Sequence, residues 1–146
     1  MAKHKRLKGL GDAMKKRADD SQKRIFSGIR KAALAVDQAA IFATPVDTGF
    51  ARSRWVVTIG QPVTSSEDGV SESIEIGGDV AAAIAASQGL KEIKKWKGVG
   101  SIFINNPLGY VVYLDEGSSE QAPQGMTEQA IAAGQAVLKE LKILEG

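Results

Sequence analysis

The stretch DAMKKRADDSQKRIFSGIRKAALAVDQAAIFA, residues 12–43, predicts a long helix. Apolar side chains recur in it every three or four residues, at Ile25, Ile29, Ala32 or Ala33, Val36 and Ala40. This spacing places them on one face of an α-helix, as a single packing stripe. Polar residues such as Asp37 are then expected to face water. Pro45 disfavours helical geometry at Thr44, so the helix is expected to end there.

Alternating apolar and polar residues predict strands farther along the chain, at 54–60, 70–77, 101–105 and 110–115. An alanine-rich segment predicts a short helix over 80–97, interrupted by Gly89, between the two strand pairs. A last helix is expected from Met126 or Thr127 to Leu144. The order indicates an α+β domain: a four-stranded, mainly antiparallel sheet packed by the long N-terminal helix and the C-terminal helix, with the short helix inserted between two hairpins.

Length and composition predict one domain. The chain has 146 residues, 43% hydrophobic and 25% charged, which is enough to bury a core. Residues 1–11, which include Gly9 and Gly11, are expected to form a flexible basic arm, and residues 12–146 the single domain. There is no cysteine, which excludes disulfides and thiolate zinc sites. No apolar run predicts a signal peptide or a membrane span, so a soluble, cytoplasmic chain with no membrane partner is expected.

Charge is distributed unevenly. Residues 1–31 hold eleven Lys or Arg against three Asp, a net of +8, whereas the remainder holds eight basic and fourteen acidic residues, a net of −6. Such an arm can contact nucleic acid or the acidic surface of a neighbouring copy, or it can simply be solvated. The candidate contact residues are Lys3, Lys5, Arg6, Lys8, Lys15, Lys16 and Arg17. Residues 91–97, with four lysines beside Trp96, are either a second contact for phosphate and base or a solvated face.

No catalytic constellation is apparent. His4 is the only histidine, which excludes histidine-dependent triads. Asp115 and Glu116 are adjacent, and on the predicted strand they would point to opposite faces. Asp47 near Arg52 and Arg54 could be an active acid beside an anion clamp, or a turn-capping carboxylate beside surface or interface charges. The glycine pairs lack the residues of a phosphate loop. The sequence therefore predicts no enzyme, no cofactor and no metal site.

Two segments carry a resemblance to a known family. The first is TPVDTG at 44–49 followed by Arg52-Ser53, which resembles the APVDTGxLRxS stretch of phage minor tail, tail-completion and neck proteins. The second runs from Asn105 to Met126 and resembles that family's N…PYaxxlExG.S.QAP.GM stretch. Phe50-Ala51 and Gly109-Tyr110 depart slightly from the usual aliphatic residue and Pro-Tyr. The two segments keep the family's order, and with the flanking helices the resemblance covers most of the chain.

The resemblance implies a structural virion protein rather than an enzyme. It implies a tail-completion or head–tail joining subunit in a homo-oligomeric ring, as a hexamer, assembled in the host cytoplasm and located in the neck or tail of the virion. Its partners would be other copies of itself, a head-connector or adaptor protein, a tail terminator or tail tube protein, and the genome DNA in the channel. The alternative is a small nucleic-acid-binding module that uses residues 3–31 and 91–97.

The two segments are hypothesised to form a contact between subunits or partners, because rings require one surface to meet a different surface of the next copy. The residues assigned to this contact are Pro45, Asp47, Thr48, Gly49, Arg52, Arg54, Glu116, Gly117, Ser118, Gln121 and Pro123.

Overall fold

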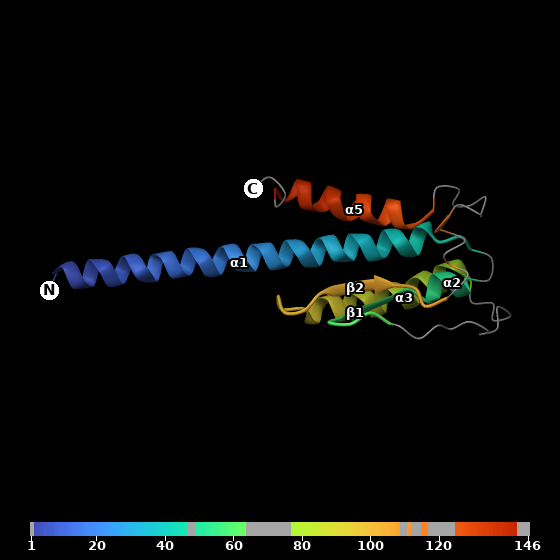
Figure 1. The fold of residues 1–146 in the computed structure, drawn as a ribbon, viewed down its shortest axis with the longest axis horizontal. Coiled ribbons are helices and arrows are strands. Elements are labelled where there is room, and N and C mark those ends of the chain that lie inside the picture. Colours follow the sequence, from blue (N-terminus) through green and yellow to red (C-terminus); the bar gives the residue numbers. More distant parts are fainter. Residues whose placement is uncertain are drawn as a thin grey trace.

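The computed structural model describes residues 2–46, 49–63, 77–108, 111, 115–116 and 125–142. In chain order its elements are α1 (Ala2–Ala43), α2 (Phe50–Ser53), β1 (Val56–Ile59), α3 (Gly78–Lys95), β2 (Ile102–Asn105) and α5 (Thr127–Glu140). The C-terminal half of α1 lies between α5 on one side and the layer of α3, β1 and β2 on the other (Figure 1). None of the described helices combines the length and the apolar character needed to cross a membrane.

The predicted four-stranded sheet is wrong: the described residues are 70% helix, and their strands form a two-stranded antiparallel sheet. β1 and β2, expected in separate hairpins, pair with each other from Val56 opposite Asn105 to Ile59 opposite Ile102. Of the expected strand at 110–115, the described residues Val111 and Asp115 are helical. A short apolar run fits the helix period as well as the strand period, which explains the error. The expected strand at 70–77 lies outside the described residues except for Gly77, which is in no strand.

A side chain occupies the edge of β1 where a third strand would pair. The Val57 amide donates to Gln88 Oε1 at 2.9 Å, and Gln88 Nε2 donates to the Val57 carbonyl at 2.8 Å. Gln88 belongs to α3, so its amide satisfies both backbone groups of Val57 in place of a neighbouring strand. The helix therefore covers this edge of the small sheet.

Small residues let α1 pack closely on both sides. A Cβ on Gly134 of α5 would collide with Val36, and one on Gly89 of α3 would collide with the Asp37 carboxylate. The predicted stripe is confirmed at Ala32, Ala33 and Ala40, which are buried. The expectation that Asp37 faces water is wrong, because the side chain is 0% exposed. α1 packs on two faces, against α5 and against α3. The prediction assumed one apolar stripe, so it placed Asp37, which lies outside that stripe, in solvent.

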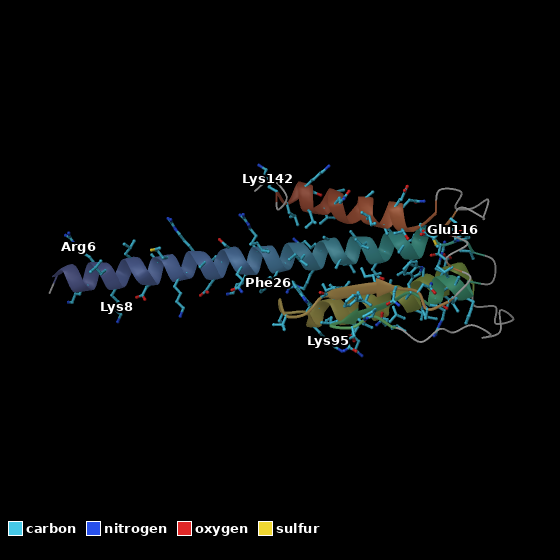
Figure 2. All side chains as sticks on the ribbon, viewed as in Figure 1. Arg6, Lys8, Phe26, Lys95, Glu116 and Lys142 are labelled. Carbon is cyan, nitrogen blue, oxygen red and sulfur yellow. The ribbon has the colours of Figure 1, made fainter. Side chains whose placement is uncertain are left out.

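The N-terminal half of α1, residues 2–25, projects beyond the rest of the molecule, and we call it the arm (Figure 1). The helix begins at Ala2, ten residues before the predicted start at residue 12, so no boundary of secondary structure separates residues 1–11 from the domain. All residues from 5 to 25 are exposed. The body begins at Phe26, whose ring packs edge-on against Trp96 at 5.3 Å between centroids (Figure 2).

Candidate functional site

The two motif segments meet at the end of the molecule opposite the arm. Asn106 Nδ2 from the second segment donates to the Ala51 carbonyl in the first at 2.8 Å. Apolar residues of both segments belong to one core cluster, with Phe50, Ala51 and Trp55 from the first and Leu108, Val111 and Met126 from the second. We call this region the motif junction. The sequence predicted that these segments meet residues of another subunit. In the structure they contact each other within one chain.

Thr44 and Trp55 fix the first segment from both ends. Trp55 Nε1 donates to Thr44 Oγ1 at 2.7 Å, and the same hydroxyl donates to the Ala40 carbonyl at 2.7 Å. Thr44 is 1% exposed and Trp55 8% exposed, so both hydrogen bonds are shielded from water. Buried polar groups are costly unless they are paired, and here each satisfies the other. The hydrogen bond between Thr44 and Trp55 therefore ties together the two ends of the first motif segment, and we call this residue pair the clasp.

The guanidinium of Arg52 makes its described contacts within its own chain. Its Nη2 donates to the carbonyls of Phe42 at 3.2 Å and Thr44 at 3.0 Å, at the C-terminal end of α1. Its guanidinium also lies 5.9 Å from the centre of the Phe42 ring. Cations near a helix C-terminus interact favourably with the unpaired carbonyls and the helix dipole. The guanidinium of Arg54, the residue after α2, lies 6.0 Å from the centre of the Phe50 ring.

Gly49 allows the first segment to approach α3. Its φ is +83°, and a Cβ there would lie 2.7 Å from the Gly77 carbonyl oxygen. A side chain is therefore excluded by both backbone conformation and space. Pro45 is half-buried just after α1. Asp47 and Thr48 lie outside the described residues, so their assigned roles stay predictions.

In the second segment, Asp115 caps α5. Its Oδ1 accepts hydrogen bonds from the amides of Met126 at 2.8 Å and Thr127 at 2.7 Å, and its Oδ2 accepts one from Thr127 Oγ1 at 2.8 Å. Burial raises the pKa of Asp115, but these three hydrogen bonds outweigh it and hold the pKa below 3.8. The helix thus receives its cap from a residue eleven positions earlier in the chain.

Replacing Asp115 by Ala is expected to destabilise the protein by about 1–2 kcal/mol near neutral pH, because two amides of α5 lose their acceptor. Asp115→Asn, which keeps one acceptor oxygen, is expected to cost less. Since the folded pKa is lowered, this stabilisation is present above pH 3.8 and is lost as the pH falls through the folded value. Urea unfolding at several pH values measures it, and equal losses for both variants would contradict the capping role.

Glu116 is exposed and lies beside the motif junction, at the end of the molecule away from the arm (Figure 2). It is the one assigned acidic residue of the contact that the structure describes. Gly117, Ser118, Gln121 and Pro123 lie outside the described residues. The motif junction also bounds a pocket of about 210 Å³ lined in part by Trp55, Asn105 and Met126.

The two basic regions differ in what they offer a partner. The assigned cations of the arm all lie in α1, Lys3 included. The described side chains among them are exposed: Lys5, Arg6, Lys8, Lys15, Lys16 and Arg17. In the second region Trp96 is only 7% exposed, and its Nε1 donates to the Gly100 carbonyl at 2.8 Å. Because this ring is buried in the body, residues 91–97 fit a solvated lysine face better than a base-stacking site.

Asp37 is the polar residue that the sequence did not single out. Neither carboxylate oxygen has a hydrogen-bond partner, and the side chain packs against Gly89 of α3, where a Cβ would collide with it. Burial raises the pKa of Asp37 from 3.8 to about 7. Within the described ranges, no three His, Cys, Asp or Glu residues gather where they could hold a metal. The raised pKa of Asp37 therefore reflects its burial.

No protein-family model matches the chain, and no curated protein or solved structure matches it either.

Proposed function

We propose that the chain is a structural subunit of a phage neck or tail, a tail-completion or head–tail joining protein that assembles as a ring. The observation that carries the proposal is the motif junction: two segments fifty residues apart, each resembling a stretch of that family, are joined by the Asn106–Ala51 hydrogen bond and a shared core. Their coming together is what a composite surface for a neighbouring subunit requires.

The chemistry at the junction favours contact over catalysis. Arg52 binds backbone carbonyls and Asp115 binds backbone amides, so the described charges hold the chain in shape. Glu116 is exposed beside them, and within the described part of the chain its carboxylate does not bind a backbone group in this way. Asp47 and Glu116 are therefore the carboxylates proposed to meet the next copy, where charge complementarity sets register and specificity.

The variants Asp47→Ala and Glu116→Ala test this contact. Each is expected to abolish ring formation or the joining of tails to heads while leaving the unfolding midpoint unchanged. Asp79→Ala, which removes an exposed carboxylate in the first turn of α3, is the matched control and should assemble normally. If Asp47→Ala and Glu116→Ala both assemble and join heads as the wild type does, the two carboxylates are not part of the contact.

A second candidate function follows from the arm. An exposed helix that carries most of the chain's basic excess can bind DNA, either as a small nucleic-acid-binding module or where the genome passes through the ring. Such binding depends on the release of counterions and weakens steeply with salt. DNA retention measured over a series of salt concentrations tests it, and no retention at low salt would exclude both forms of the idea.

A further inference from the structure

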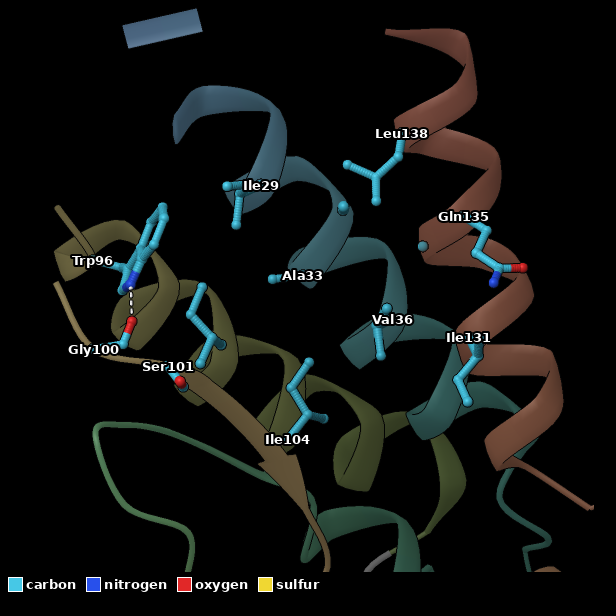
Figure 3. Close-up of a pocket in the computed structure, with 13 residues that line it drawn as sticks. Ile29, Ala33, Val36, Trp96, Gly100, Ser101, Ile104, Ile131, Gln135 and Leu138 are labelled. Atoms are coloured by element: carbon cyan, nitrogen blue, oxygen red, sulfur yellow. Dashed lines mark hydrogen bonds between the residues drawn. The ribbon is translucent and has the colours of Figure 1, made fainter. Parts of the chain in front are cut away.

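An apolar groove of about 620 Å³ runs along the body between α5 and β2, with α1 as its floor (Figure 3). Ile131 and Leu138 form one wall, Ile102 and Ile104 the other, and Ile29 and Val36 lie on the floor. Ile131 is 50% exposed although it faces this groove. A concave site lined mainly by apolar side chains is the kind of surface that binds an apolar partner.

The arm carries a matching surface. Leu7, Leu10 and Met14 are 67%, 59% and 63% exposed and follow the spacing i, i+3, i+7, which puts them on one face of α1. Helices derive most of their stability from the packing of such a face. Throughout residues 5–25 the arm is exposed, so this face is unpartnered within the described chain.

We infer that the arm of one copy docks in the groove of a second copy. A helix that binds in an apolar groove does so through anchors at i, i+3 and i+7, which Leu7, Leu10 and Met14 supply. The arm cannot fold back into its own groove, because Met14 and the groove residue Ile29 lie on one continuous helix about 22 Å apart.

The distribution of charge favours docking of the arm in the groove over pairing of two arms. The arm, residues 2–25, holds nine Lys or Arg and three Asp, a net of +6, and residues 26–146 hold ten Lys or Arg and fourteen Asp or Glu, a net of −4. Arm against arm therefore repels, and arm against body attracts. The run of three large apolar residues is also shorter than the three to four heptads that a coiled coil between two arms needs. The inference deepens the proposed function and rests on it for the ring: arm and groove supply the main contact between adjacent copies, and the carboxylates at the motif junction are proposed to complete it.

Arm and groove are different surfaces, so each copy gives one contact and receives another. Such a head-to-tail interface closes into a ring or continues as a filament. It also predicts a directional effect of charge on the groove wall. Gln135 is exposed and lines the groove, so Gln135→Lys should weaken association with the cationic arm at least tenfold and Gln135→Glu should strengthen it.

Analytical ultracentrifugation of the whole chain tests the docking. The arm variant is Leu7→Gln/Leu10→Gln/Met14→Gln, and the groove variant is Ile131→Lys/Gln135→Lys, which changes only exposed side chains of α5. The matched control, Lys5→Gln/Asp12→Gln/Lys16→Gln, alters the opposite face of the arm. The wild type and the control should associate, and the arm and groove variants should each be monomeric. Circular dichroism should show unchanged helix content in all of them.

An equimolar mixture of the two variants gives the sharpest readout. One intact arm and one intact groove remain, so the mixture should form a one-to-one dimer and nothing larger. A mixture that stays monomeric, or an arm variant that associates like the wild type, would overturn the inference. If the arm variant still forms closed rings, the inference fails and the ring function stands; if the wild type forms only arm-dependent dimers or filaments, the inference stands and the ring function fails.

Discussion

Asp37→Asn is expected to stabilise the protein by roughly 4 kcal/mol at about pH 8, the free-energy equivalent of a pKa raised from 3.8 to about 7. The wild-type carboxyl is protonated in the folded state below pH 7 and ionised in the unfolded state above 3.8. The contribution of Asp37 to stability is therefore greatest below pH 3.8, falls as the pH rises through this window, and levels off above 7. Asn is neutral and nearly isosteric, so the variant should not show this fall.

Urea unfolding from pH 4 to pH 9 measures the effect. The wild type and Asp37→Asn should have similar stability at the acid end and diverge as the pH rises. Asp79→Asn, on the exposed first turn of α3, is the control and should keep the wild-type slope. The same slope in Asp37→Asn and in the wild type would show that the carboxyl is solvated in the folded protein, contrary to its complete burial against Gly89.

Trp55→Ala is expected to destabilise the protein by about 3–5 kcal/mol, the usual cost of removing a buried tryptophan from a core. The ring belongs to the core cluster that joins the two motif segments, so the junction should loosen before α1 and α5 separate. Trp55→Phe keeps most of the packing and loses only the hydrogen bond to Thr44, whose hydroxyl still donates to the Ala40 carbonyl. Its expected cost is about 1–2 kcal/mol.

Denaturant unfolding of the two variants separates packing from hydrogen bonding at this residue. Amide hydrogen exchange adds the location: in Trp55→Ala, protection should fall first in α2 and at the start of α5. Equal losses for Ala and Phe would mean that the indole N–H, rather than the ring, holds the junction together. A loss below about 1 kcal/mol for Ala would contradict the clasp.

The helices were predictable because their signal is local. The spacing of small and apolar residues gave α1, α3 and α5, and the end of α1 before Pro45 follows from backbone sterics. β1 and β2 also lie where alternation placed them. Their pairing could not be read from alternation, because alternation does not show which strand pairs with which. Gln88, thirty-one residues beyond Val57, closes the other edge of β1 through its side-chain amide, and no local pattern marks that contact.

The candidate site was predictable only as a set of segments. The motif strings drew attention to residues 44–55 and 105–126, and these do converge. The functions within them depend on partners distant in sequence: Arg52 binds the end of α1, and Asp115 binds the start of α5. Asp37 was missed for the same reason. Its burial arises from Gly89 on another helix, and a one-helix pattern carries no signal for that contact.

Electron microscopy of the purified chain tests the central claim most directly. The proposed neck or tail subunit should appear as closed rings of identical copies. Compact monomers that never close into rings, and that shift DNA at low salt, would contradict the claim and favour the nucleic-acid-binding module.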